Sequence, residues 1–167
     1  EILSGFDEAR LVWRGVLYGH PKFALCPTLI VDVGGGSTEL LGAFLEKPST
    51  IASIPIGSLV THRRWLGFGV TQMRRIEHAR GRIKHLFAGA LTLSSAIFPD
   101  FLIATGGTIQ RLVRVVEGRE MSIDEMDGYQ LTRAALVDCV ATLCQAKTPA
   151  NRRMLPGIDI GRADFLL

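Results

Sequence analysis

The chain has 167 residues, of which 47% are hydrophobic, and its formal net charge at pH 7 is only +3. This length and composition predict one compact globular domain with a substantial core and argue against a low-complexity chain. No signal peptide or apolar stretch of membrane-spanning length is visible, so neither export nor membrane insertion is indicated. Three cysteines without metal-like spacing indicate reduced thiols in a cytoplasmic protein: Cys26, Cys139 and Cys144.

The first predicted element is a helix over residues 6–18. Ser4, followed three residues later by Asp7, has the pattern of a capping box, and Gly19 before His20-Pro21 ends the helix. Apolar residues at helical spacing form its predicted buried face: Ala9, Val12, Trp13, Val16 and Leu17.

A short apolar strand follows and ends near Asp32. The three glycines Gly34, Gly35 and Gly36 then allow a tight reversal and leave backbone N–H groups free to face an anion. If Gly35 and Gly36 form a two-residue hairpin turn, Asp32 lies opposite Glu39 on the next strand.

Directly opposed carboxylates repel each other, and a cation would relieve that repulsion. Asp32 and Glu39, beside the hydroxyl of Ser37 and a set of N–H groups, would suit Mg²⁺ with phosphate oxygens completing its shell. The alternative is that the glycines only form a hairpin and that both carboxylates are solvated at its mouth.

The hairpin is predicted to continue through residues 40–45, a turn at Lys47-Pro-Ser and a third strand over residues 50–56. A short helix follows at 58–66. Thr71 is the expected N-cap of a long helix to about Leu91, with a close-packed Gly81 and an inward face formed by Met73, Ile76, Ile83, Phe87 and Leu91.

A fourth strand over residues 101–104 runs into a glycine turn at Gly106 and Gly107, and Thr108 opens the next helix. Residues 118–128 read as a surface loop. Two further helices are predicted, at about 131–145 with Ala135, Val137, Cys139, Val140 and Leu143 inward, and at 148–154 behind the N-cap Thr148. This order of elements indicates the α/β class.

Positive charge is concentrated between Arg63 and His85, where seven basic side chains accompany the single acid Glu77. The functional interpretation is a track for a polyanion, and the alternative is a solvated helix face. The seven are Arg63, Arg64, Arg74, Arg75, Arg80, Arg82 and Lys84.

The motif from Asp32 to Glu39 resembles the second phosphate loop of the exopolyphosphatase and guanosine pentaphosphate phosphohydrolase (Ppx/GppA) family. Four further segments resemble that family in the same order: Ser4 to Leu11, Ser53 to Val60, Ala104 to Thr108, and Leu155 to Asp164. The resemblance implies the actin-like, sugar-kinase-like ATPase superfold, in which this chain would be a ribonuclease H-like lobe with a mixed sheet flanked by helices.

In that resemblance, residues 1–167 form a single lobe of a longer protein with two lobes or more. Glu8 would be the base that activates water, although a first-turn helix acid favoured by the dipole is the alternative. Asp32 and Glu39 would hold Mg²⁺. The phosphate-binding groups would be those of Gly34, Gly35, Gly36, Ser37, Gly106, Gly107 and Thr108, and for the last three a packing role is the alternative.

The resemblance implies a hydrolase that releases terminal phosphate from inorganic polyphosphate or guanosine pentaphosphate. Two alternatives stay open, a non-hydrolytic nucleotide- or polyphosphate-binding regulatory module and a kinase lobe of the same superfold. The expected partners are the phosphate substrate, the missing lobe of the same chain and a second copy in a homodimer, with no membrane and no specific nucleic acid. Alone, the chain is expected to be weakly active or inactive.

Overall fold

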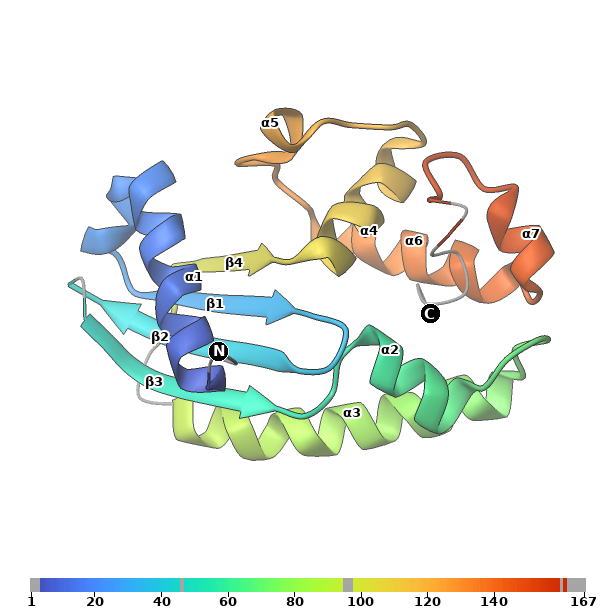
Figure 1. Cartoon of the computed structure of the whole chain (residues 1–167), viewed down its shortest axis with the longest axis horizontal. Coiled ribbons are helices and arrows are strands. Elements are labelled where there is room, and N and C mark those ends of the chain that lie inside the picture. Colours follow the sequence, from blue (N-terminus) through green and yellow to red (C-terminus); the bar gives the residue numbers. More distant parts are fainter. Residues whose placement is uncertain (1–3, 46, 95–97, 160, 162–167) are drawn as a thin grey trace. The chain divides into compact units, whose positions relative to one another are not determined.

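The computed structural model describes residues 4–45, 47–94, 98–159 and 161 (Figure 1). Contacts divide the chain into two compact units. The first contains residues 1–57 and 82–106, and the second contains residues 58–81 and 107–167. The single-lobe description of residues 1–167 therefore stays a prediction, and each unit is described by itself. Residues 160 and 162–164, which belong to the last segment that resembles the family, lie outside the described residues.

The first unit is built on a four-stranded mixed sheet with the order β3-β2-β1-β4. The strands β1 (Thr28–Val33), β2 (Thr38–Phe44) and β3 (Lys47–Ile54) form an antiparallel meander, and β4 (Phe101–Thr105) pairs in parallel with β1. This is the predicted ribonuclease H-like mixed sheet, and the fold class is confirmed.

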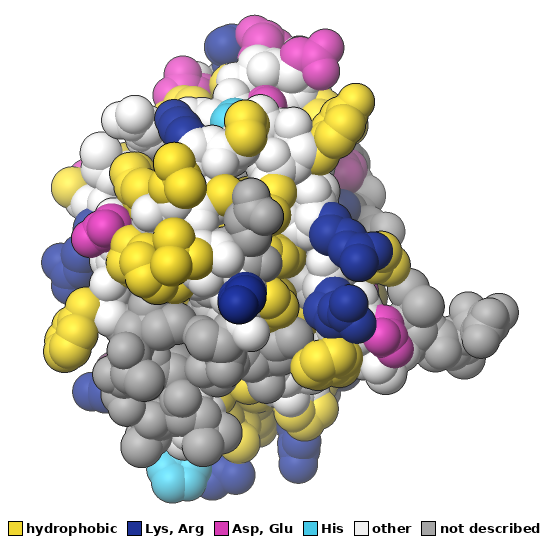
Figure 2. All heavy atoms as spheres, turned by 90° about the vertical axis from the view of Figure 1, so that its left-hand side faces the viewer, with side chains coloured by type: hydrophobic (Ala, Val, Ile, Leu, Met, Phe, Trp, Pro, Cys, Tyr) yellow, Lys and Arg dark blue, Asp and Glu magenta, His cyan; other side chains and the backbone are white. Residues whose placement is uncertain are grey.

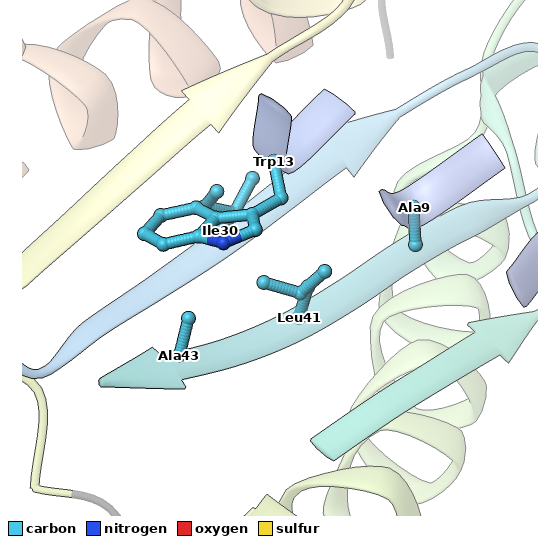
Figure 3. Packing of buried hydrophobic residues seen from close by; sticks show 5 residues of the cluster. All are labelled: Ala9, Trp13, Ile30, Leu41 and Ala43. Atoms are coloured by element: carbon cyan, nitrogen blue, oxygen red, sulfur yellow. The ribbon is translucent and has the colours of Figure 1, made fainter. Parts of the chain in front are cut away.

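Helix α1 (Gly5–Gly19) packs on one face of this sheet. Its N-cap is Ser4, whose hydroxyl accepts from the Asp7 N–H at 3.2 Å and donates to the Asp7 carboxylate at 2.6 Å. Figure 3 shows Ala9 and Trp13 of α1 directed toward the strands, where they form a buried cluster with Ile30, Leu41 and Ala43. The predicted buried face of this helix is confirmed.

The end of the sheet that lies away from the glycine turn is apolar at its surface. A 3₁₀ turn (Pro21–Leu25) leads from α1 into β1 there. Figure 2 looks onto this end and shows hydrophobic side chains interspersed with Lys and Arg. The exposed apolar residues of the first unit at this end include Leu25, Phe44, Leu45, Phe101 and Leu102.

The turn predicted at Lys47-Pro-Ser is wrong, because β3 already begins at Lys47. The chain reverses earlier, at Leu45, which has a positive φ of 51°. Pro48 is tolerated inside β3 because β3 is an edge strand, where a missing N–H need not break the ladder.

The second unit is helical. It contains α2 (Ser58–Thr61), a π-helical turn (His62–Leu66), α4 (Gly107–Glu117), α5 (Ile123–Met126), α6 (Arg133–Gln145) and α7 (Pro149–Arg153). Helix α3 (Met73–Ser94) is shared, with its residues up to Gly81 in this unit. One apolar cluster joins Cys139, Leu143 and Ile158 with residues of α4, and another joins Leu66, Ile76 and Ala79.

Several local predictions fail in the helices. Thr71 does not cap α3, since its N–H donates to Lys147 O and its hydroxyl accepts from the buried Arg152. Gly81 has no close neighbour, because a β-carbon there would meet no atom within 4 Å. Three residues expected inward are exposed: Met73, Leu91 and Val137.

The loop expected over residues 118–128 contains the short helix α5, which the sequence signals through a capping box. Ser122 accepts from the Glu125 N–H, and the Glu125 carboxylate accepts from the Ser122 N–H. No helix among the described residues is long and apolar enough to cross a membrane.

Candidate functional site

The glycine turn between β1 and β2 closes as the sequence predicts. The Gly34 N–H donates to Ser37 O at 3.1 Å, which leaves Gly35 and Gly36 as the two residues of the loop. In this register Asp32 pairs directly with Glu39. The predicted opposition of the two carboxylates is confirmed.

The register of the sheet extends this pair into a row of four polar side chains. Asp32 is also the partner of Thr105 on β4, and Glu39 is the partner of Ser53 on β3. Paired residues of neighbouring strands project from the same face of a sheet. The row Thr105, Asp32, Glu39, Ser53 therefore crosses all four strands, with the two carboxylates inside and the two hydroxyls outside.

This row lies at the edge of the sheet face that α1 covers, next to the glycine turn. Two residues further from the turn, the same face carries Ile30 and Leu41, which are buried beneath Trp13. Side chains alternate along a strand with a period of two, so the polar row continues the apolar core at the edge next to the turn. The core thus fixes the backbone from which both carboxylates project.

The two carboxylates lie in a partly desolvated setting. Glu39 is only 3% exposed, and its Oε1 accepts from the Ser53 hydroxyl at 2.9 Å. Burial raises the pKa of the Asp32 carboxyl above its ordinary value, and repulsion from Glu39 adds to the rise. The Thr105 hydroxyl lies close enough to offset part of it, although its geometry falls short of a well-formed hydrogen bond.

Two glycines from other segments lie against this turn. Gly106 has a φ of +93°, and a β-carbon there would overlap the Asp32 carboxylate and lie 2.8 Å from Val33 O. Gly57 lies against the turn itself, where a β-carbon would overlap Gly35 and lie 2.6 Å from Gly34 O. Both positions therefore require glycine, and Gly57 allows its segment to approach the turn closely.

The glycines of the turn differ in how closely they are packed. Neither Gly34 nor Gly36 has a positive φ, so the left-handed freedom of glycine is not used at these two positions. A β-carbon on Gly34 would lie 3.2 Å from Ser37 O, whereas one on Gly36 would meet nothing within 4 Å. Thr38 has a structural role, because its buried hydroxyl donates to Ile56 O at 2.6 Å.

Glu8 lies in the first turn of α1 and is exposed. The start of that helix packs beside the polar row, since a β-carbon on Gly5 would be 2.8 Å from Ser53 Oγ and 3.9 Å from Glu39 Oε1. Residues three apart on a helix are neighbours on its surface. Glu8 therefore lies one turn from the point where α1 meets the Glu39 end of the row.

The second predicted phosphate loop is divided between the units. Gly106 belongs to the first unit, whereas Gly107 and Thr108 begin α4 in the second. The Thr108 hydroxyl donates to Ser58 Oγ at 3.3 Å within that unit. Phosphate binding by Gly107 and Thr108 stays a prediction.

The residues present fit a magnesium ion at the polar row. Carboxylate and hydroxyl oxygens are the ligand type that Mg²⁺ takes, usually with several waters and substrate phosphates. Among the described residues, no three His, Cys, Asp or Glu side chains come together. Asp32 and Glu39 would therefore supply the protein's charge, and the rest of the shell would be water and phosphate oxygen.

Sequence reasoning missed Ser53 and Thr105 as members of this site. Thr105 could have been found, because it stands between the predicted strand over residues 101–104 and the predicted glycine turn at Gly106. Ser53 could not, because the misplaced turn at Lys47 left the register of β3 unknown.

Known relatives match nearly the whole chain. An exopolyphosphatase 1 of Mycobacterium leprae is 28% identical over 166 residues, which is 98% of this chain and 48% of the relative. An exopolyphosphatase 1 of Mycobacterium tuberculosis is likewise 28% identical, over 98% of this chain and 47% of the relative. The chain thus spans about half the length of the curated relatives it matches.

Solved structures agree on the fold. An exopolyphosphatase-like protein superimposes with a TM-score of 0.86 at 25% identity, covering 99% of this chain and 52% of that one. An exopolyphosphatase from Cytophaga hutchinsonii gives a TM-score of 0.81 at 21% identity, over 99% of this chain and 54% of that one. The family model for Ppx/GppA phosphatases matches residues 1–167. The chain belongs to the Ppx/GppA phosphatase family.

Proposed function

We propose that this chain is part of a Mg²⁺-dependent hydrolase that removes the terminal phosphate of inorganic polyphosphate. The observation that supports this most strongly is the direct opposition of Asp32 and Glu39 beside a glycine turn. A cation would relieve the repulsion between two carboxylates that the sheet register holds directly opposite each other. Gly57 packs tightly against this turn, and Gly106 packs against Asp32 and Val33 at the end of β1, so the backbone around the two carboxylates is held in place.

In this proposal each group of the chain has a separate task. Asp32 and Glu39 hold Mg²⁺, which when bound would neutralise charge on the phosphoryl oxygens. The Gly34 N–H already closes the turn, so phosphate would be bound there by the N–H groups of Gly35 and Gly36 and by the Ser37 hydroxyl. Gly107 and Thr108 would bind phosphate at the N-terminus of α4. Glu8 accepts a proton from the attacking water.

Two features support the assignment of Glu8. It is exposed, whereas its neighbour Asp7 is engaged with the Ser4 hydroxyl in the helix cap. It also lies one turn from the contact between Gly5 and the Glu39 end of the polar row. A module that only binds polyphosphate would need no base at this position.

Polyphosphate is the leading candidate substrate because the similar Mycobacterium proteins are exopolyphosphatases. Guanosine pentaphosphate is the alternative substrate, since it also ends in a phosphoanhydride. A kinase lobe of the same superfold would transfer the phosphate to an acceptor, so release of phosphate to water alone separates it from a hydrolase.

The test is a phosphate-release assay with polyphosphate and Mg²⁺ on the longer protein whose sequence includes this chain. Glu8→Gln should lower kcat by at least about a hundredfold, as expected for loss of a general base, with KM nearly unchanged. Asp7→Asn, at the adjacent position, is the matched control and should retain most activity. An undiminished rate in Glu8→Gln would refute the role of Glu8.

The 167-residue chain alone, assayed in parallel, is expected to release little phosphate. Positioning accounts for several kcal/mol of a barrier, on the order of 7–11 at most, and a site lacking part of its walls loses much of it. Rapid Mg²⁺-dependent turnover by the chain alone would contradict this part of the proposal.

A further inference from the structure

The hydroxyl of Thr105 is the feature of the polar row that the fold itself leaves unexplained. Its Oγ1 is buried, and none of the described groups meets it with hydrogen-bond geometry. Buried hydroxyls are nearly always hydrogen-bonded, so such an atom calls for a reason. The other outer hydroxyl of the row, that of Ser53, already donates to Glu39.

The surroundings of Thr105 point to a ligand beside Asp32. Thr105 is the direct partner of Asp32 in the parallel ladder between β1 and β4. The next residue, Gly106, closes against the Asp32 carboxylate in a left-handed conformation that a larger side chain would not tolerate. The hydroxyl is therefore held beside Asp32 by backbone geometry, close enough to lower the pKa of that carboxyl but without a well-formed hydrogen bond to it.

We propose that Thr105 is a positioning residue of the site, whose hydroxyl binds a water of the Asp32-bound cation or an oxygen of the phosphoryl group. This inference rests on the proposed function, since it needs a hydrated cation and phosphate at Asp32. It extends that function to β4, the strand at the other side of the row from Ser53. The two outer hydroxyls of the row then differ in role: that of Ser53 orients Glu39, and that of Thr105 binds the ligand.

Thr28 is a matched control for this hydroxyl. It lies on the same strand as Asp32 and projects from the same face, four residues away, where it is fully buried. Unlike Thr105, its hydroxyl has a partner within the fold, since it donates to Cys26 O at 3.0 Å. Valine has nearly the shape of threonine, so the same substitution at both sites removes only a hydroxyl.

The experiment measures Mn²⁺ binding to the longer protein by electron paramagnetic resonance, with inorganic phosphate present, alongside thermal unfolding without metal. Thr105→Val should weaken Mn²⁺ binding by about five- to tenfold, the value of one hydrogen bond, and leave the melting temperature unchanged or higher. Thr28→Val should show the reverse, a lower melting temperature with unchanged Mn²⁺ affinity. Thr105→Ser, which keeps the hydroxyl, should bind Mn²⁺ within about twofold of wild type.

Asp32→Asn separates this inference from the proposed function. If Asp32→Asn loses Mn²⁺ binding while Thr105→Val binds as wild type does, the cation site stands and the role of Thr105 is refuted. If Asp32→Asn binds Mn²⁺ as wild type does, the cation site and the role of Thr105 are both refuted. If Thr105→Ser bound Mn²⁺ as weakly as Thr105→Val does, the proposal would also be overturned. The shape of the side chain, and not its hydroxyl, would then determine Mn²⁺ affinity.

Discussion

Gly57 lies so close to Gly35 that a β-carbon on Gly57 would overlap the Gly35 carbonyl group. Gly57, three residues after the end of β3, is thus in close contact with the turn between β1 and β2. The turn is thereby held from outside as well as by its own hydrogen bond between Gly34 and Ser37.

This contact predicts that Gly57→Ala destabilises the fold by about 1–3 kcal/mol, the usual cost of overpacking. Gly36→Ala is the matched control in the turn itself, because a β-carbon there meets nothing within 4 Å. It should change the free energy of unfolding by less than about 1 kcal/mol. Urea denaturation of both variants measures the difference. Equal losses of stability would contradict this prediction, because the turn would then accommodate a β-carbon at position 57 without cost.

The raised pKa of Asp32 predicts a pH-dependent cost to stability. Because the folded-state pKa lies above the unfolded value near 3.8, the folded protein binds more protons between those two values. The contribution of Asp32 is therefore favourable below the unfolded pKa and is lost as pH rises through the folded one. Ionised Asp32 destabilises the metal-free protein at neutral pH.

Asp32→Asn should accordingly raise the melting temperature of the metal-free protein at pH 7, and the gain should vanish below about pH 3.8. Asp138→Asn, at an exposed position on α6, should show no such gain. Added Mg²⁺ should stabilise wild type by about 1.4 kcal/mol at ten times its Kd, and should not stabilise Asp32→Asn. A melting temperature of Asp32→Asn below that of wild type at pH 7 would contradict the destabilisation assigned to ionised Asp32.

The basic stretch from Arg63 to His85 predicts a dependence on polyphosphate length. Arg74, Arg80 and Arg82 are exposed on α3, whereas Arg75 also donates to Leu66 O at 2.8 Å and so supports the fold. Replacing the first three with Gln should weaken long-chain polyphosphate more than short chains, because phosphate contacts add along a polyanion.

The same triple variant should flatten the salt dependence of long-chain binding, by about 2 units in the slope of log affinity against log salt. Fluorescence titrations at several salt concentrations measure this slope. Short polyphosphate chains, which can make only a few ionic contacts, serve as the internal control. Equal losses at every chain length, or none, would leave the stretch as a solvated helix face.

The sequence was most informative where structure is local. A two-residue turn determines the register of its own strands, so the Asp32–Glu39 pair followed from counting outward from Gly35 and Gly36. The caps at Ser4, Thr132 and Thr148 were equally local, since each side chain accepts from an N–H three residues on. All of these could be predicted from a few neighbouring letters.

Long-range contacts could not be predicted in this way. Thr71 is of a residue type that commonly caps helices, yet its hydroxyl accepts a hydrogen bond from Arg152, which lies 81 residues later in the chain. Ser53 lies in the polar row because the register between β2 and β3 shifts between Gly42 and Ala43. The sequence gives no clear signal of this irregularity. The pair Asp32–Glu39 was therefore predictable, whereas the hydroxyls that flank it depended on the assembled sheet.

The central claim is that Asp32 and Glu39 act together on one Mg²⁺ ion, and a double-mutant cycle tests it most directly. Calorimetric Mg²⁺ titrations, with phosphate present, would compare the longer protein with its Asp32→Asn, Glu39→Gln and doubly substituted variants. Each single substitution should weaken Mg²⁺ binding by at least about tenfold, and the double variant should lose little more than either, because neighbouring ligands of one ion are not additive. Mg²⁺ affinity unchanged in both single variants, or two losses that simply multiply in the double variant, would contradict a shared ion.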